Sequence, residues 1–458
     1  MTTTAQKMPL WLEKLLGQHP DQTHRPLEEF VNAAPRLEAL SDVASGTPVL
    51  VRGDVDCKPG TSVGDGDVRL RSMLPTLRFG QERGWKQILL GHRGRDPEAS
   101  LSQVRIRLQE LLPGEVGFVE NWLDAESLQV TSAFEQAIER CPTGGFVLLE
   151  NTRKYEIERA LWKAKSAEIE RLAPRLAQFA DSLAGVAGVY VNEAFSAGSL
   201  DASSTIVPAA VGRVALGQYA ANEFAGPVLR CRDASLVVFS GLKADKLDDL
   251  EGIVNRGKVR MVIAAGSLAM ALLKGRALLD GADYCLGVAE APSHVDKPYY
   301  IPPERIRQAT RMIFAGRENN VEFVLPVDFV LADGSIANSV PPDGQQLDVG
   351  PATSDAFAHK VSEFLETQAE KVVFHNGVFG KFEDPAYEEG TRKFVLQFKR
   401  MKDKGAEVYV GGGEGGKALE RYGQPEWVTH CFTAGGTVLN ALGDEPIPYL
   451  LALHMASQ

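Results

Sequence analysis

Short runs of apolar residues alternate with longer amphipathic segments along most of the chain. In the first half, apolar runs occur at 49–55, 87–90 and 145–149, and residues 101–112 and 160–183 carry apolar side chains at helical spacing. Strands that alternate with helices predict parallel βαβ units. Because these strands are apolar almost throughout, we expect helices to cover both faces of the sheet.

The second half repeats this pattern. Its apolar runs lie at 236–239, 261–264, 322–326, 371–374 and 407–410. A chain of 458 residues is longer than one hydrophobic core usually supports. The sequence therefore predicts an α/β protein with two doubly wound parallel-sheet domains. A helical stretch over 214–224 is the expected connection, and it should end at Gly226-Pro227 because this pair stops helices.

Composition and charge narrow the class of protein. The sequence has no run of eighteen apolar residues, and its start lacks the pattern of a secretory signal. The formal net charge of −11 disfavours binding to nucleic acid or to a membrane. Five widely spaced cysteines without a C-x-x-C pair indicate reduced thiols rather than a metal or redox site. We expect a cytoplasmic monomer.

Basic side chains recur where the predicted strands of the first half end. They are Arg52, Arg69, His92, Arg95 and Arg153, with Asp54 close to the first of them. Ligands bind beyond the carboxyl ends of parallel strands, so these side chains are expected to converge on one basic cleft. Any one arginine alone would be read as a solvated surface charge. Their recurrence favours a site for an anionic small molecule, because guanidinium groups bind carboxylate and phosphate.

A glycine-rich turn stands between a predicted strand and a predicted helix in the second half. The turn contains Gly411, Gly412 and Gly413 and is followed by Glu414. Glycines let backbone amides approach a phosphate closely, and the helix N-terminus favours negative charge. Glu414 could hold Mg²⁺. The same turn is often purely structural, so it indicates a nucleotide site only together with other features.

Further candidates for a nucleotide site follow two other predicted strands. Lys243 and Lys246 follow Gly241 at a predicted helix start, where a lysine opposes the helix dipole. Asn376 follows the apolar run at 371–374, and Glu383 could accept hydrogen bonds from a ribose. Taken singly, a lysine or glutamate of this kind could equally be a solvated surface residue.

In this order, the segments resemble those of phosphoglycerate kinases. The likeness extends from about residue 37 to the C-terminus. VRGDVD is similar to the family's V-R-V-D-F-N, GHRGR to S-H-L-G-R-P, LLENTRKYEIE to L-L-E-N-x-R-F-x-x-E-E, and VGGGEGG to I-G-G-G-D-[ST]. The resemblance implies an ATP- and Mg²⁺-dependent carboxylate kinase that forms an acyl phosphate. It also implies two Rossmann-like parallel-sheet domains separated by a cleft, one for the acid and one for the nucleotide, which a hinge closure brings together.

The resemblance also implies the limits of the domains. In chain order these are an N-terminal extension (1–36), the acid-binding domain (37–213), an interdomain helix (214–228), the nucleotide-binding domain (229–443) and a C-terminal peptide that returns to the first domain (444–458).

Roles are implied for residues that match the family by position. Arg69 matches the catalytic arginine at the reacting carboxylate. Lys243 matches the lysine that follows the phosphoryl group, and Lys246 matches one that holds nucleotide phosphates. The substrate's 3-phosphate would be bound by Arg95 and Arg153.

The other matched positions complete the two implied sites. Arg52 and His92 would neighbour the 3-phosphate. Asn376 and Glu383 match nucleotide contacts, and Glu414 stands where the family has an aspartate associated with magnesium.

The chain departs from the family on the acid side. Ser199-Leu200-Asp201-Ala202 replaces the family's H-R-A-H, so Leu200 stands in place of an arginine, and Asp56 replaces an asparagine close to Asp54. These changes predict a less anionic acid than 3-phosphoglycerate, for example one with an amine near Asp54 and Asp56, although Arg93 could supply the missing charge. An ordinary phosphoglycerate kinase and a catalytically inactive binding homologue remain alternatives. The spacing of Lys243 and Lys246, one residue shorter than in the family, leaves their division of roles open.

Overall fold

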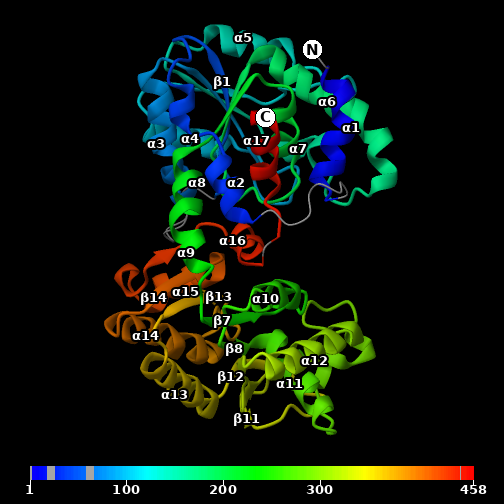
Figure 1. Ribbon diagram of the computed structural model, residues 1–458, viewed down its shortest axis with the longest axis vertical. Helices are drawn as coiled ribbons and strands as arrows, with labels where there is room; N and C mark the ends of the chain where they lie inside the picture. The colour runs from blue at the N-terminus through cyan, green and yellow to red at the C-terminus, as the bar shows by residue number, and fades with distance from the viewer. Residues whose placement is uncertain (1–2, 18–25, 58–66, 444) are drawn as a thin grey trace. The chain divides into compact units, whose positions relative to one another are not determined.

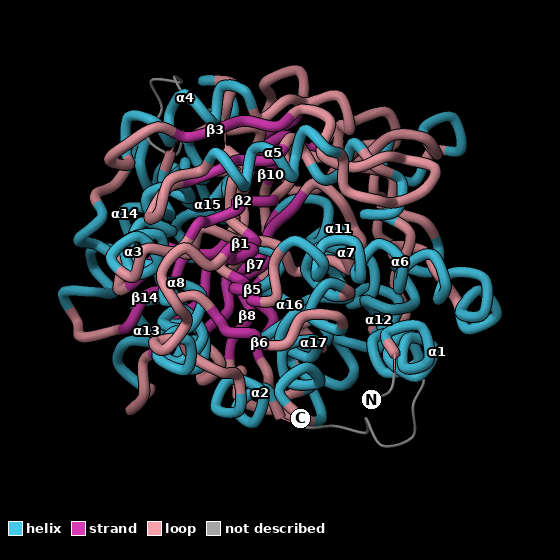
Figure 2. Tube along the Cα trace, turned by 90° about the horizontal axis from the view of Figure 1, so that it is seen from above, coloured by secondary structure: helices cyan, strands magenta, loops and turns pink. Residues whose placement is uncertain are grey.

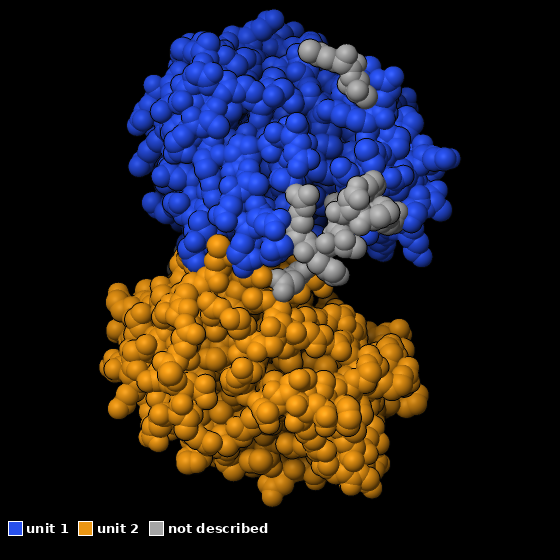
Figure 3. All heavy atoms as spheres, in the orientation of Figure 1, with its two compact units in different colours: residues 1–226, 446–458 blue, residues 227–445 orange. Residues whose placement is uncertain are grey.

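The computed structural model describes residues 3–17, 26–57, 67–443 and 445–458. The chain forms two compact units (Figure 3). Unit 1 contains residues 1–226 and 446–458, and unit 2 contains residues 227–445. Each unit has its own sheet and its own core.

Unit 1 is built on a six-stranded parallel sheet of order β3-β4-β2-β1-β5-β6, part of which can be followed in Figure 2. Its strands are β1 (Pro48–Arg52), β2 (Lys86–Leu90), β3 (Val116–Val119), β4 (Phe146–Leu149), β5 (Val189–Asn192) and β6 (Arg213–Leu216). Val51 at the centre pairs with Leu89 on one side and with Val191 on the other. All three side chains are buried, as expected for a sheet covered on both faces.

Helices surround this sheet. They are α1 (Thr4–Leu15), α2 (Leu27–Ala33), α3 (Val68–Glu82), α4 (Ser102–Leu111), α5 (Ser132–Arg140), α6 (Ile169–Val186), α7 (Ala202–Thr205), α8 (Gln218–Glu223) and α17 (Pro448–Ser457). The N-terminal α1 packs on α6 (Figure 1). Trp11 Nε1 of α1 donates to the Thr205 carbonyl at 2.9 Å. The C-terminal α17 packs on α2, α7 and β6. Both ends of the chain are thus part of unit 1.

Unit 2 contains a second parallel sheet of order β15-β14-β13-β7-β8-β9. Its strands are β7 (Leu236–Gly241), β8 (Met261–Ala265), β9 (Glu322–Val324), β13 (Val372–Asn376), β14 (Glu407–Gly411) and β15 (His430–Cys431). A separate antiparallel sheet contains β10 (Phe329–Leu331), β11 (Ile336–Ala337) and β12 (Gln346–Val349).

The helices of unit 2 complete its layers. They are α9 (Leu229–Cys231), α10 (Lys246–Asn255), α11 (Gly266–Leu279), α12 (Pro303–Glu318), α13 (Pro351–Thr367), α14 (Glu389–Asp403), α15 (Gly413–Tyr422) and α16 (Gly435–Leu442). Helix α11 packs on α12, and α13 packs on α14. Buried Phe357, Phe394 and Phe398 contribute to the core between the helices and the sheet.

The two parallel sheets confirm the predicted α/β class, but two predicted helices are wrong in detail. The helix predicted over 160–183 begins only at Ile169, after turns and a 3₁₀ segment (Ser166–Glu168). In the predicted helix over 214–224, Val214–Leu216 instead belong to β6, because this apolar run pairs with β5. The helix also continues past Gly226-Pro227 as a π-helical turn (Phe224–Val228), since the wider turn accommodates the missing proline amide.

Among the described residues, none of the helices combines the length and apolar character needed to cross a membrane.

Candidate active site

In unit 1, side chains from the ends of three parallel strands converge on one buried carboxylate, Asp201. Arg52 ends β1, His92 follows β2, and Arg153 follows β4. Asp201 lies after β5 and directly precedes α7. Ligands and polar groups gather at such strand ends because the sheet is doubly wound.

The Asp201 carboxylate is fully enclosed and accepts several hydrogen bonds. Arg153 Nη2 lies 3.0 Å from its Oδ2 and 3.2 Å from its Oδ1, and Arg52 Nη2 lies 3.3 Å from Oδ2. Trp162 Nε1 donates to Oδ1 at 2.8 Å, and the Arg153 guanidinium lies over the Trp162 ring. Asp201 is 0% exposed. Two of the predicted substrate-binding arginines are therefore paired with a carboxylate of the protein itself.

His92 is an uncharged member of this cluster. Burial, and then the positive charges of Arg52, Arg153 and Arg69, lower the pKa of His92 well below its ordinary value. Its Nδ1 lies 2.7 Å from Arg52 Nη2. Since a guanidinium can only donate, Nδ1 accepts this hydrogen bond and Nε2 carries the proton. His92 does not add a positive charge to the predicted basic patch.

A second buried carboxyl group, Glu158, lies behind Arg52. Its oxygens accept hydrogen bonds from the Ser203 hydroxyl at 2.6 Å and the Ser203 amide at 2.8 Å, and the same hydroxyl accepts from Arg52 Nε at 2.9 Å. Burial, followed by the nearby negative charge of Asp201, raises the pKa of Glu158. The positive charge of Arg52 is thus opposed from two sides.

Arg69, the predicted catalytic arginine, lies on the first turn of α3 and faces two aspartates. Its Nη1 lies 3.1 Å from Asp56 Oδ2, and its Nε lies 3.9 Å from Asp54 Oδ1. Asp54 is buried, and Ser196 Oγ donates to it at 2.6 Å. Burial raises the pKa of Asp54, although Arg69 opposes this shift. Asp56 remains partly exposed, so a substrate amine would meet Asp56 rather than the enclosed Asp54.

The two remaining arginines of this region lie outside the cluster. Arg95 is exposed, in contrast to Arg52 and Arg153. Arg93 Nη1 donates to the Ser100 carbonyl at 2.6 Å. One nitrogen of the Arg93 guanidinium is thus held by the backbone.

In unit 2, the glycine-rich turn joins β14 to α15. Gly411 ends the strand, Gly412 has a φ of +83°, and Gly413 begins the helix. A Cβ on Gly412 would lie 3.2 Å from Asn376 Nδ2. The positive φ and the close approach of the Asn376 amide explain why glycine stands at 412. The first backbone amides of α15 follow this turn, and they lie at the N-terminal end of the helix, which favours anions.

Lys246 and Asn376 meet beside this turn. Lys246 Nζ donates to the Ser240 carbonyl at 3.2 Å and to Asn376 Oδ1 at 3.4 Å. Gly241 leaves room for the lysine, because a Cβ there would lie 2.6 Å from Lys246 Cδ. Lys243 differs in being exposed. The structure thus holds Lys246 at the strand end and leaves Lys243 on the surface.

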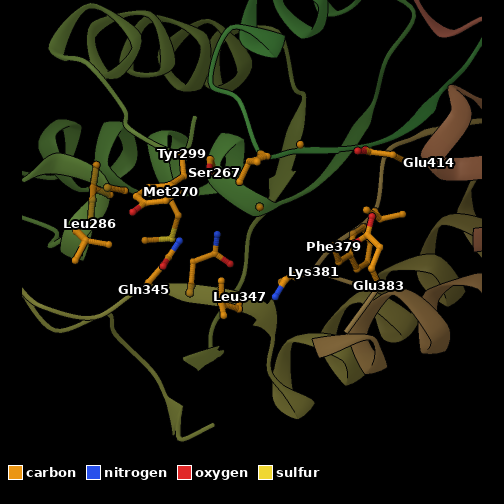
Figure 4. A pocket seen from close by; sticks show the side chains of 18 residues that line it. Ser267, Met270, Leu286, Tyr299, Gln345, Leu347, Phe379, Lys381, Glu383 and Glu414 are labelled. Carbon is orange, nitrogen blue, oxygen red and sulfur yellow. The ribbon is translucent and has the colours of Figure 1, made fainter. Parts of the chain in front are cut away.

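Three of the predicted nucleotide residues, Gly241, Glu383 and Glu414, line a pocket of unit 2 (Figure 4). Met270, Leu286 and Tyr299 line one part of it, and Glu383 and Glu414 line another. Such a pocket, with apolar walls and a few polar groups, is typical of sites for small organic ligands. The apolar side chains were not among the residues predicted from the sequence, because they are ordinary members of loops and helices.

The buried Asp348 fixes the loop that carries Glu383. Its carboxylate accepts the Gly390 amide at 2.8 Å and the Val349 amide at 2.9 Å. The Lys381 amide donates to the neighbouring Leu347 carbonyl at 2.9 Å. Burial raises the pKa of Asp348 to about 7, although its backbone hydrogen bonds oppose the shift. Asp348 is a positioning residue that sequence reasoning missed.

Across the described part of the chain, there is no group of three or more His, Cys, Asp and Glu side chains able to hold a metal ion. Glu414 stands in the first turn of α15 and is exposed. One carboxylate beside a phosphate-binding turn fits Mg²⁺, which commonly takes one or two protein carboxylates and completes its shell with phosphate oxygens and water.

Comparison with known proteins gives consistent matches. The family model described as "PGK: Phosphoglycerate kinase" matches residues 40–445. "Phosphoglycerate kinase, cytosolic" of Triticum aestivum is 30% identical over 433 residues, which cover 90% of this chain and 96% of that protein. "Phosphoglycerate kinase" of Clostridium beijerinckii is 29% identical over 431 residues, which cover 91% of this chain and 98% of that protein. The crystal structure of the enzyme from Pyrococcus horikoshii has a TM-score of 0.71 at 22% identity and covers 92% and 99% of the two chains, a likeness of fold.

Proposed function

Because the chain belongs to the phosphoglycerate kinase family, we propose that it transfers the γ-phosphoryl group between ATP and a carboxylate and forms an acyl phosphate. The observation that carries the proposal is the nucleotide pocket of unit 2. Gly241, Glu383 and Glu414 line this pocket, and the turn at Gly412, which opens α15, lies beside Asn376 and its partner Lys246. Amides, a lysine and a carboxylate for magnesium are the parts that phosphoryl transfer from ATP requires.

The chemistry needs charge neutralisation rather than a general base. A carboxylic acid with a pKa of about 4 is already ionised at neutral pH, so the nucleophile is present without proton transfer. The obstacle is repulsion between two anions. Arg69 orients the attacking carboxylate, and Lys243 and Lys246 stabilise the transferring phosphoryl oxygens together with the amides of the glycine turn. Exclusion of water then protects the acyl phosphate from hydrolysis.

Glu414 would hold a magnesium ion, together with the nucleotide phosphates. When bound, the ion supplies positive charge at the phosphate oxygens. The glutamate is one methylene longer than the family's aspartate, so it reaches further from the helix while keeping the same charge. The adjacent Gly413 and Gly415 leave this first turn without bulky side chains.

We further propose that the acid is less anionic than 3-phosphoglycerate. Leu200 stands where the family has an arginine, and Arg69 is paired with Asp56, an acidic residue that the family pattern lacks. A unit charge about 4 Å away contributes roughly 4 kcal/mol at an effective dielectric of about 20. Removal of a cation and addition of an anion therefore disfavour a phosphate dianion strongly.

An ordinary phosphoglycerate kinase is the second candidate. It is favoured by the names of the relatives, which match at about 30% identity over about nine tenths of this chain. In that case the chain would turn over 3-phosphoglycerate efficiently despite Leu200 and Asp56.

ATP consumption in the presence of a panel of acids tests both candidates. The panel contains 3-phosphoglycerate, glycerate and amino-bearing acids of similar length, and hydroxylamine trapping identifies the acyl phosphate. We expect turnover of at least one acid without a phosphate group. Efficient turnover of 3-phosphoglycerate alone would support the second candidate, and binding of Mg-ATP without turnover of any acid would contradict both.

A further inference from the structure

The Asp201 carboxylate is bound by the kind of donors that bind an anionic ligand. Arg52 and Arg153 supply guanidinium groups, and Trp162 supplies an indole N–H at 2.8 Å. The same planar groups bind carboxylate and phosphate oxygens. Because Asp201 is 0% exposed, these contacts are not shared with solvent. An anion of the protein therefore fills the centre of this arginine cluster.

Carboxyl groups of unit 1 itself face both arginines of the cluster. Arg52 and Arg153 face the carboxyl groups of Asp201 and Glu158, either directly or through Ser203. His92 completes the ring of side chains as a neutral acceptor from Arg52. An incoming phosphate dianion would thus enter a cluster in which the Asp201 carboxylate already offsets positive charge of the two arginines, and burial makes excess negative charge costly there.

We propose that the Asp201 carboxylate acts as an internal substitute for the anionic end of a substrate, so that the accepted acid carries an uncharged group at the end remote from its reacting carboxylate. Asp201 is then a specificity-determining residue. The apolar Leu200 beside it belongs to the same departure from the family pattern, the replacement of H-R-A-H at positions 199–202. The inference rests on the proposed function, since it names the class of acid that the carboxylate kinase takes. Removal of the Asp201 carboxylate should therefore reopen a site for phosphate.

The experiment compares the wild type with Asp201→Asn and Asp201→Ala in the full-length protein. Calorimetry measures the binding of glycerate and of 3-phosphoglycerate, two acids that differ only in the terminal phosphate. We expect the wild type to bind 3-phosphoglycerate no more tightly than glycerate. In both variants the affinity for 3-phosphoglycerate relative to that for glycerate should rise at least tenfold. Asp42→Ala, which removes a mostly exposed carboxylate of unit 1, is the matched control and should not change the ratio.

A second readout allows for loss of stability in the variants. If Asp201→Ala is unstable because its arginines have lost their counter-charge, inorganic phosphate at constant ionic strength should raise its melting temperature by several degrees more than that of the wild type or Asp42→Ala. A wild type that prefers 3-phosphoglycerate tenfold or more would overturn the proposal. Variants that show neither the changed ratio nor the phosphate rescue would also overturn it.

These outcomes are separate from those of the proposed function. Binding ratios and phosphate rescue need no turnover, so they judge the role of Asp201 even if no acid is phosphorylated. Turnover of an unphosphorylated acid combined with unchanged ratios in both variants would support the kinase and overturn the role of Asp201.

Discussion

Arg153 Nη2 lies 3.0 Å and 3.2 Å from the two carboxylate oxygens of Asp201, and both side chains are buried. This pairing changes what the arginine does for the protein. In the family pattern the matching arginine binds a phosphate of the substrate, whereas here its guanidinium also donates to the Gly94 carbonyl at 2.6 Å and lies over the Trp162 ring. Arg153 is thus part of the packed structure of unit 1.

Replacement of Arg153 by alanine should therefore destabilise unit 1. The change leaves the buried Asp201 with less compensation, and breaking a buried ion pair costs about 3 kcal/mol or more. Denaturant unfolding measures the free energy of unfolding. Arg213→Ala is the control, because its pair with Asp42 is exposed and such pairs contribute less than about 1 kcal/mol. Equal effects of the two variants would show that the buried pair does not stabilise the unit.

Replacement of Arg69 by alanine should lower turnover by about 100-fold or more, since removal of one preorganised donor in an active site costs about that much. Arg69→Lys should recover part of the loss, because it keeps the charge but not the planar fork. The matched control is Arg71→Ala on the same helix, where the arginine is mostly exposed and paired with Asp67. Near wild-type turnover by Arg69→Ala would exclude its proposed role.

The two lysines of the β7–α10 turn should separate in their effects. Lys246 contacts Ser240 and Asn376, so Lys246→Met should weaken ATP binding about tenfold. The exposed Lys243 should mainly affect the transfer step, and Lys243→Met should lower kcat more than the affinity for ATP. Steady-state kinetics with calorimetric ATP titrations resolve the two effects. If Lys243→Met mainly weakened ATP binding and Lys246→Met mainly lowered kcat, the proposed roles of the two lysines would be exchanged.

The fold and the glycine-rich turn between β14 and α15 could largely be predicted from the sequence, because their signals are local. Near-continuous apolar strands alternate with amphipathic helices, and the turn around Gly412 contains its glycines in one segment. The start of the helix predicted at 214–224 was wrong, because Val214–Leu216 fit either a buried strand or a helix face, and pairing with β5 decides between them.

The arginine cluster of unit 1 could be predicted only in part, because its net charge depends on which charged side chains meet in the folded chain. The sequence predicted that basic residues gather at strand ends, and Arg52, His92 and Arg153 do meet. It did not predict that Asp201 would pair with both arginines, since a carboxylate after a glycine- and serine-containing loop looks like a solvated residue. The signal was the replacement at 199–202, where an aspartate enters beside the missing arginine.

Replacement of Glu414 by glutamine should weaken the dependence on magnesium. The substitution removes one negative charge but keeps the shape of the side chain, so we expect the Mg²⁺ concentration for half-maximal activity to rise about tenfold. Glu420→Gln, on the same helix α15 but in its later part, serves as the control. An unchanged magnesium titration for Glu414→Gln would exclude it as a ligand.

Stability should fall as the pH rises, and Glu193 should account for part of this fall. Glu193 is buried between α3 and α8, where it accepts hydrogen bonds from Thr76 Oγ1 at 2.7 Å and the Tyr219 amide at 3.0 Å. Burial raises the pKa of Glu193 from 4.5 to about 8, although these hydrogen bonds oppose the shift. Between these two values the folded protein keeps a proton that the unfolded chain has released. The free energy of unfolding should therefore decrease with increasing pH across this window.

Glu193→Gln should remove this contribution while keeping an acceptor for the amide. The decrease in the free energy of unfolding between pH 5 and pH 8 should become smaller by a few kcal/mol, since each unit of pKa shift corresponds to about 1.4 kcal/mol. Part of the slope should remain, because Asp348 in unit 2 also has a raised pKa. Glu170→Gln, an exposed position on α6, should leave the slope unchanged. A slope in Glu193→Gln equal to that of the wild type would show that Glu193 is ionised in the folded protein throughout this range, held by its hydrogen bonds from Thr76 and α8 despite its burial.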